Sequence, residues 1–430
     1  MLILSLTTWL ACAENAPVAP IEPASPVELA PPVEPVEAEP AAAAQPPLAA
    51  HPPAVATPLL VPDGALDGLF ASLDAVAAAE GEPAGPIARI LSWGDSTIAG
   101  DGIVSTVRDR LQAELGDGGP GFLTAHVDPN HAYREGVAQW AEGDWVSLSI
   151  TFGGAETPRY GLAGIVSTAT GEAKSVLGGR LIDGQRQPLH RFDLYFQYQP
   201  GGGSFTTGGG PISTAAPGVS DGFMELRADG GMPLLGLTTL GDGPVSFYGV
   251  ALETAGPGVT WETFGVAGSG VGSMGRQLGS HVAAQVARRD PALVVYWTGA
   301  NEWGYESVTE GEGEAYQEIY EGVVERLRVG APEASCLLIG PLDQGTWATT
   351  DITSEPALEK LITVQKRAAE HLGCAYWDAR AAMGGEGSFK GWLEHEPPLA
   401  MDDRLHLNDE GKVLIGESLA DALLLAWRSR

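Results

Sequence analysis

Two short segments, far apart in the chain, carry residue types that together could perform nucleophilic catalysis. Ser96 follows Gly94 and Asp95, and Asp403 stands three residues before His406. A serine hydroxyl is a weak nucleophile unless a neighbouring base takes its proton, and a histidine base needs a carboxylate to fix its tautomer. Ser96, His406 and Asp403 can fill these roles. Each segment alone is weak evidence, because a serine at a helix start is often only an N-cap.

Two further residues could stabilise the negative charge that develops when a carbonyl is attacked. Asn301, in Gly299-Ala300-Asn301-Glu302, offers a neutral amide donor of the kind found in oxyanion holes. Gly268 has no side chain, so its backbone N–H can approach the same oxygen. Considered singly, Asn301 could equally be a turn residue and Gly268 a loop glycine.

The residues around these segments predict alternating strands and helices. An apolar run at 88–93 stops at Gly94, and apolar residues then recur at helical spacing from Ile98, which places Ser96 at a strand-to-helix turn. The alternation resumes late in the chain, with strands expected at 293–297, 336–339 and 374–377 and helices at 278–286, 316–327, 354–371 and after the N-cap Asn408. Such alternation indicates a parallel sheet covered by helices, with the site at the carboxyl ends of its strands.

The middle of the chain has a different pattern. Short alternating strands separated by glycine turns predict a β-sandwich, jelly-roll-like in character, inserted after the first βα unit. We therefore expect five segments: a signal peptide at 1–12, a Pro/Ala-rich linker at 13–62, an α/β domain in two parts at 63–117 and 259–430, and the inserted sandwich at 118–258.

Composition narrows the possible partners. The chain has 24 Lys and Arg against 55 Asp and Glu, a formal net charge of −31, which excludes nucleic acid and anionic membrane surfaces as partners. The apolar start and the Pro/Ala-rich linker favour an exported protein held off a surface by a tether. Cys12 closes the apolar run as it would in a lipoprotein signal, although Ala11-Cys12-Ala13 also fits ordinary signal cleavage.

These segments, in this order, resemble the four sequence blocks of the SGNH (GDSL) hydrolases. The blocks here are Gly94-Asp95-Ser96, Gly268, Gly299-Ala300-Asn301-Glu302 and Asp403-Arg404-Leu405-His406. The resemblance implies a flavodoxin-like three-layer α/β/α domain. It also implies Ser96 as nucleophile, Asp403 and His406 as its triad partners, and the N–H groups of Ser96 and Gly268 with the Asn301 amide as oxyanion donors.

A narrower resemblance concerns the peptidoglycan O-acetylesterases. The inserted sandwich, the Gly-Asp-Gly-Gly-Pro-Gly-Phe run at 116–122 and the approach to the last block are similar to members of that group. Thr97, Thr263, Ala267 and Glu302 depart from residues often seen there, so the substrate stays open. We expect an exported, extracytoplasmic esterase that removes small acyl groups, chiefly acetyl, from a cell-wall or extracellular polysaccharide, with no metal or organic cofactor.

Several alternatives remain open from the sequence. A polysaccharide O-acyltransferase would use the same triad and the same covalent intermediate, and a tethered glycan-binding protein could carry an unused site. Exposed aromatic residues of the insert could stack on sugars, although period-2 aromatics are usually core; the candidates are Tyr195, Tyr198, Phe205 and Trp140. Cys336 and Cys374 could pair in an oxidising compartment or remain two buried thiols.

Overall fold

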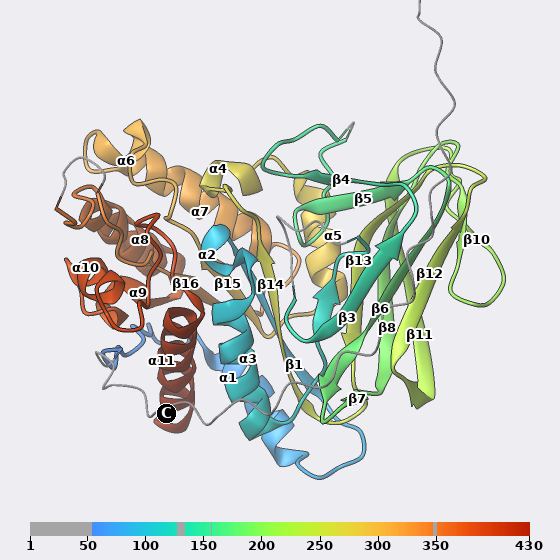
Figure 1. Ribbon diagram of the computed structural model, residues 1–430, viewed down its shortest axis with the longest axis horizontal. Coiled ribbons are helices and arrows are strands. Elements are labelled where there is room, and N and C mark those ends of the chain that lie inside the picture. The colour runs from blue at the N-terminus through green and yellow to red at the C-terminus, as the bar shows by residue number, and fades with distance from the viewer. Residues whose placement is uncertain (1–53, 127–133, 156, 347–350) are drawn as a thin grey trace, which may run out of the picture. The chain divides into compact units, whose positions relative to one another are not determined.

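A five-stranded parallel sheet forms the centre of the α/β domain. The computed structural model describes residues 54–126, 134–155, 157–346 and 351–430. The strand order is β14-β1-β15-β16-β17, and every neighbouring pair is parallel (Figure 1). The strands are β1 (Ile87–Gly94), β14 (Gly258–Gly265), β15 (Leu293–Trp297), β16 (Ser335–Ile339) and β17 (Ala375–Trp377). Their residues are almost all buried, as expected for a sheet covered on both faces.

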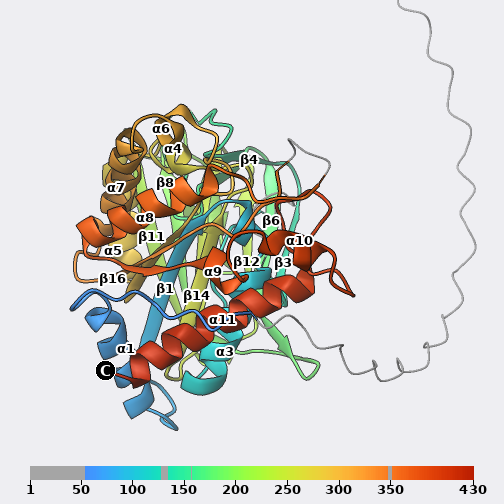
Figure 2. The same cartoon turned by 90° about the vertical axis from the view of Figure 1, so that its left-hand side faces the viewer.

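Helices cover the two faces of this sheet, which confirms the three-layer fold. One apolar cluster holds side chains of α1 (Asp67–Ala78), α3 (Gly102–Leu115) and α11 (Asp409–Arg428), and Figure 2 shows α11 lying alongside α3. The other cluster holds side chains of α5 (Gly279–Arg289), α7 (Glu314–Arg328) and α8 (Leu358–Leu372). Shorter helices complete the domain: α2 (Ser96–Ala99), α4 (Val271–Met274), α6 (Glu306–Thr309), α9 (Ala379–Ala382) and α10 (Ser388–Leu393).

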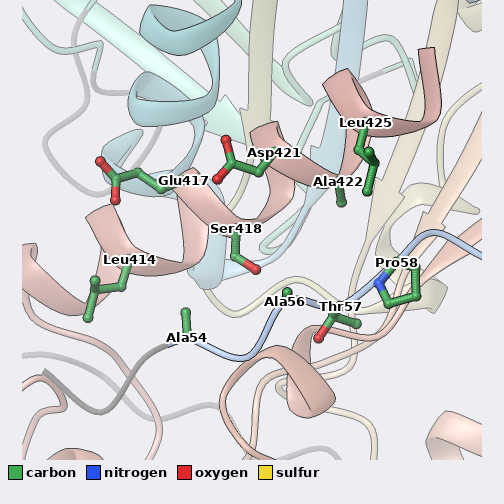
Figure 3. A pocket seen from close by; sticks show the side chains of 10 residues that line it. All are labelled: Ala54, Ala56, Thr57, Pro58, Leu414, Glu417, Ser418, Asp421, Ala422 and Leu425. Atoms are coloured by element: carbon green, nitrogen blue, oxygen red, sulfur yellow. The ribbon is translucent and has the colours of Figure 1, made fainter. Parts of the chain in front are cut away.

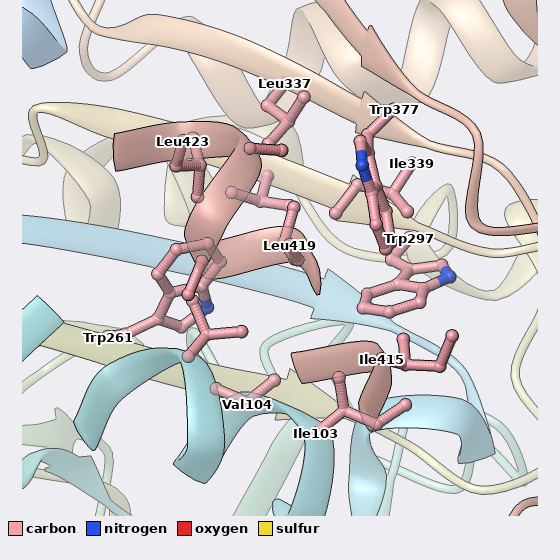
Figure 4. Packing of buried hydrophobic residues seen from close by; sticks show 14 of the residues in the cluster. Ile103, Val104, Trp261, Trp297, Leu337, Ile339, Trp377, Ile415, Leu419 and Leu423 are labelled. Atoms are coloured by element: carbon pink, nitrogen blue, oxygen red, sulfur yellow. The ribbon is translucent and has the colours of Figure 1, made fainter. Parts of the chain in front are cut away.

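Figure 4 shows the packing of the first cluster. Side chains of α11 lie among three tryptophans of the sheet, Trp261, Trp297 and Trp377. Alternate residues of β1 serve the two faces, since Ile90 belongs to this cluster and Leu91 to the opposite one. Burial on both sides makes β1 a mostly apolar strand, and it ends at the site.

The helix expected from Ile98 onward is interrupted. Asp101 adopts a left-handed conformation (φ 61°), and the chain forms α2 and α3 instead of one helix. The Asp101 carboxylate is fully buried and accepts from the guanidinium groups of Arg108 (2.9 Å) and Arg134 (3.3 Å). This buried charge cluster explains the break, because the backbone turns to present Asp101 to both arginines. The helix expected at 354 also starts later, at Leu358.

Two antiparallel six-stranded sheets form the sandwich domain. One has the order β10-β9-β12-β6-β3 with β7 beside β6, and the other has the order β11-β8-β13-β5-β4 with β2 beside β13. The strands are β2 (Gly121–Leu123), β3 (Val137–Glu142), β4 (Trp145–Ser149), β5 (Ile165–Ala169), β6 (Glu172–Ile182), β7 (Gln185–Arg186), β8 (Leu189–Tyr198), β9 (Ser204–Thr206), β10 (Ile212–Ser213), β11 (Ser220–Met232), β12 (Leu234–Leu240) and β13 (Val245–Glu253).

The aromatic residues of the sandwich are mostly core. Tyr195 and Phe205 are fully buried and Tyr198 is partly buried, so they offer no open stacking surface. Trp140, on β3, remains 42% exposed, with the Lys174 ammonium 5.2 Å from its ring centroid.

A buried ion network joins the sandwich to the α/β domain. Glu253, at the end of β13, pairs with Arg89 of β1 (2.6 Å) and with Arg289 of α5 (2.5 Å). Arg289 also pairs with Glu262 of β14. Burial would raise the pKa of Glu253, but the arginines outweigh burial and hold this pKa well below its usual range. A charged network of this kind fixes the relative orientation of the elements that it joins.

Residues 54–62, here called the strap and assigned to the linker in the sequence analysis, are bonded to the edge of the central sheet. Leu60 exchanges two backbone hydrogen bonds with Tyr376 of β17, each 2.8 Å, and the Trp377 indole donates to the Thr57 carbonyl (3.0 Å). These bonds pair backbone N–H and C=O groups at the outer edge of the sheet, and they hold the strap against that edge. A cavity of about 420 Å³ lies between the strap and α11 (Figure 3). The predicted signal peptide, Cys12 and the rest of the linker lie outside the described residues.

Cys336 and Cys374 form a disulfide, which decides the alternative left open by the sequence. Cys336 lies on β16, and Cys374 is the residue before the neighbouring strand β17; their Cα atoms are 4.8 Å apart.

No helix within the described ranges is long and apolar enough to span a bilayer.

Candidate active site

Ser96 lies at a sharp turn between β1 and α2. The turn requires glycine at position 94, because a Cβ there would lie 2.3 Å from the Trp297 carbonyl oxygen. Asp95 is the N-cap of α2, and its carboxylate accepts from the Thr97 N–H at 2.8 Å. The Ser96 backbone N–H therefore belongs to the free, electropositive end of the helix.

The Asp95 side chain also ties this turn to the loop that carries Asn301. Its second oxygen accepts from the N–H groups of Gly299 (3.2 Å) and Ala300 (3.0 Å). Burial raises the pKa of Asp95, while these hydrogen bonds oppose the rise. Asp95 therefore makes a positioning contact between two segments of the site.

Ser96, His406 and Asp403 form one hydrogen-bonded chain. The distance from Ser96 Oγ to His406 Nε2 is 2.8 Å, and from His406 Nδ1 to Asp403 Oδ2 it is 2.6 Å. The carboxylate beside Nδ1 keeps the proton on that nitrogen, so Nε2 is free to accept from the serine hydroxyl. Asn408, as expected, caps α11 directly after this loop by accepting from the Gly411 N–H (3.3 Å).

Asp403 is held in its ionised form by its surroundings. Its other oxygen accepts from the backbone N–H groups of His406 (2.9 Å) and Leu405 (3.0 Å). Partial burial would raise the pKa of Asp403, but these hydrogen bonds and the His406 side chain outweigh it and lower the pKa below its ordinary value.

Gly268 and Asn301 lie on turns that pack against the end of β1. Gly268 has φ +71°, a conformation that favours glycine, and the Ser269 N–H closes its turn onto the Val266 carbonyl (3.0 Å). The Gly94 carbonyl accepts from the Val266 N–H (3.1 Å) and the Ser269 hydroxyl (3.0 Å). The Asn301 amide donates to the Ser269 carbonyl at 2.8 Å, which uses one of its two N–H bonds.

Glu302 is a buried acid directly after Asn301. Its side chain is 0% exposed, and Oε1 accepts from the Val271 N–H (2.8 Å). Burial, with a smaller contribution from Asp95, raises the pKa of Glu302 to about 8. Glu302 is therefore largely neutral at pH 7, and it links the Asn301 loop to the start of α4.

A loop of the sandwich domain also reaches the site, which the sequence analysis missed. The loop at 149–154 follows β4, and Thr151 Cγ2 lies 3.8 Å from where a Cβ on Gly268 would be. Arg276 holds the loop by donating from Nη1 to the carbonyls of Ile150 (3.1 Å) and Thr151 (2.6 Å). The sole signal for this loop in the sequence is the pair Gly153 and Gly154 after a strand. Two such glycines indicate a turn, but they do not indicate that the turn lies beside Gly268.

Among the residues that the structure describes, no group of three or more His, Cys, Asp or Glu side chains is arranged to hold a metal ion. The cavity in Figure 3 lies along the later turns of α11 and is lined by none of the triad residues. The groups gathered at the described site are a serine hydroxyl, an imidazole, a carboxylate and an amide.

Comparison with known proteins agrees with this chemistry. The model of the GDSL-like lipase/acylhydrolase family matches residues 202–414, which include Gly268, Asn301, Asp403 and His406 and begin after Ser96. No curated protein matched the chain.

A solved structure entitled "Peptidoglycan O-acetylesterase in action, 5 min" is similar with a TM-score of 0.70 and 25% identity, over 84% of this chain and 97% of that one. The acetylxylan esterase Axe2 from Geobacillus stearothermophilus has a TM-score of 0.29 and 20% identity, over 40% of this chain and 77% of that one. The acetyl xylan esterase AlAXEase has a TM-score of 0.28 and 18% identity, over 38% and 80%. The chain belongs to the GDSL-like (SGNH) acylhydrolase family and is a carboxylic ester hydrolase.

Proposed function

We propose that this protein is an exported esterase that removes acetyl groups from a cell-wall or extracellular polysaccharide through a Ser96–His406–Asp403 triad. The observation that carries the proposal is the continuous hydrogen-bonded chain from Ser96 Oγ through His406 to Asp403. A serine with a base oriented by a carboxylate is the arrangement that acyl transfer needs.

The reaction runs in two halves. Ser96 Oγ attacks the ester carbonyl carbon while His406 Nε2 takes the hydroxyl proton, and Asp403 stabilises the imidazolium. The oxyanion accepts hydrogen bonds from the N–H groups of Ser96 and Gly268 and from the second N–H of the Asn301 amide. Collapse of this intermediate breaks the ester C–O bond, and His406 returns the proton to the leaving sugar hydroxyl. Water, deprotonated by His406, then attacks the acetyl-serine and releases acetate.

The polysaccharide assignment has two supports. The solved structure that shares 84% of this chain is a peptidoglycan O-acetylesterase, and the shared portion is too large to lack the sandwich domain. The net charge of −31 disfavours polyanionic substrates such as nucleic acids. We assign residues 63–117 and 259–430 to the hydrolase domain and 118–258 to the insert, and we place the protein outside the cytoplasm, with lipidation of Cys12 as its only proposed membrane attachment.

The test compares acetate release from O-acetylated peptidoglycan, O-acetylated xylan and an aryl acetate, with Ser96→Ala as the control variant. Release that Ser96→Ala abolishes supports the triad, and the faster polymer identifies the substrate class. Acetyl transfer from the aryl ester to an added sugar, in place of acetate release, would favour the acyltransferase alternative. A folded protein that binds glycan but cleaves none of the three esters would refute the proposal in favour of a tethered glycan-binding role.

A further inference from the structure

Two exposed aromatic side chains, one from each domain, lie on segments that adjoin Gly268 and Asn301. Phe152, in the loop at 149–154 of the sandwich domain, is 81% exposed, and Tyr305, just beyond Asn301, is 44% exposed. Large exposed aromatic side chains beside a catalytic group point to ligand binding, because they add nothing to the core.

The loop that carries Phe152 is fixed before any ligand binds. Ile150 is fully buried and its N–H donates to the Gly164 carbonyl (2.8 Å), while the Gly153 N–H donates to the Ser149 carbonyl (2.9 Å). Arg276 holds the same backbone from the other side. Phe152 therefore projects from a rigid turn, and a rigid aromatic side chain costs little ordering entropy when a ligand stacks on it.

Arg276 lies near both aromatic residues. It binds the carbonyl of Thr151, the residue before Phe152, at 2.6 Å. It also acts electrostatically on Tyr305. Partial burial and the Glu302 carboxyl raise the pKa of Tyr305, and the positive charge of Arg276 opposes this rise. The Tyr305 N–H donates to the Glu302 carbonyl (2.9 Å), which keeps Tyr305 on the Asn301 loop. Figure 1 shows the loop after β4, α4 and α6 along the same edge of the molecule.

We propose that Phe152, Arg276 and Tyr305 form a sugar-binding subsite beside Gly268 and Asn301, which receives a pyranose ring of the esterified glycan. The apolar C–H face of a pyranose packs on aromatic rings, and the guanidinium and phenol supply hydrogen bonds to its hydroxyl or carboxylate groups. A junction between domains is a usual place for such a site. The inference rests on the proposed function in one respect: both take the alcohol part of the ester to be a sugar.

The experiment measures binding of unacetylated tetrasaccharides, chitotetraose and xylotetraose, to the full chain by titration calorimetry. We expect Phe152→Ala and Tyr305→Ala each to raise Kd about two- to tenfold, the range that one aromatic contact supplies. Phe152→Trp should restore binding because it retains a stacking ring. Leu181→Ala, a substitution of an exposed apolar side chain on β6 of the same domain, should leave Kd unchanged.

Three results would overturn the subsite: neither tetrasaccharide binds the unmodified chain, Phe152→Trp binds as weakly as Phe152→Ala, or Leu181→Ala weakens binding equally. The assay needs no acetyl ester, so its outcome is separate from that of the proposed function. Sugar binding that depends on Phe152, combined with no acetate release from either polymer, would sustain the subsite and refute the deacetylase proposal.

Discussion

The buried acid Glu302 leads to a quantitative prediction about stability and pH. Its carboxyl group is inaccessible to solvent, lies near Asp95, and accepts a hydrogen bond from the Val271 N–H. Glu302→Gln keeps the shape of the side chain and this acceptor while removing the titration. The substitution therefore isolates the electrostatic cost of ionising Glu302 inside the protein.

The magnitude follows from the pKa of Glu302, which is about 8 against an ordinary value of 4.5. Each pKa unit is worth about 1.4 kcal/mol. Because the pKa is raised in the folded state, the associated stability is complete below pH 4.5 and is lost as the pH rises toward 8. Between pH 5 and pH 9 the unmodified protein should lose about 4 kcal/mol of unfolding free energy that Glu302→Gln does not lose.

The assay is urea unfolding of both proteins at pH 5, 7 and 9, followed by tryptophan fluorescence. The free energy of unfolding of Glu302→Gln, relative to that of the unmodified protein, should increase as the pH rises. Glu306→Gln, a substitution of an exposed residue at the start of α6, is the matched control and should show no such trend. Parallel pH dependences for Glu302→Gln and the unmodified protein would refute the assignment of a buried, neutral Glu302.

Three further predictions concern the triad, the oxyanion donor and the disulfide. Asp403→Asn should lower kcat on an aryl acetate by about 10⁴-fold, since it permits the wrong His406 tautomer, and a loss below tenfold would contradict the triad. Asn301→Ala should lower kcat by about 10²- to 10³-fold with little change in KM, and a change confined to KM would argue against an oxyanion role. Replacing both Cys336 and Cys374 with Ala opens a loop with a sequence separation of 38, which should cost about 4 kcal/mol of stability in urea unfolding. Reduction of the unmodified protein should give the same shift, and an equal midpoint with and without reductant would refute this contribution.

Much of the fold could be predicted from the sequence because its central strands are buried on both faces. Such strands are mostly apolar runs, and the runs at 88–93, 293–297 and 336–339 correspond to β1, β15 and β16. The break between α2 and α3 could not be predicted in this way. It depends on Asp101 meeting Arg134, which lies outside that helix, and helical periodicity carries no information about such a partner.

The candidate site likewise has residues that the sequence could predict and contacts that it could not. Ser96, Asp403 and His406 could be chosen because the chemistry demands particular residue types, and the structure brings their side chains within hydrogen-bonding distance. The contacts of Asp95 with Gly299 and Ala300 could not be foreseen, since they join segments separated by the whole sandwich domain. Pairing of the cysteines likewise depended on β16 and β17 being neighbours, which is a property of strand order.

The position of the insert has a consequence for how the polypeptide assembles. β1 is synthesised before the sandwich domain, but β14 and β15, the strands on either side of it, are synthesised afterwards. An emerging chain therefore carries an apolar strand without neighbours until the insert is finished. The sandwich has its own core, and the pairing of β2 with β13 brings its two ends together, which delivers β14 next to β1. The insert thus holds its two junctions with the central sheet close together, and His406 can reach Ser96 only after the last segment of the chain has been synthesised.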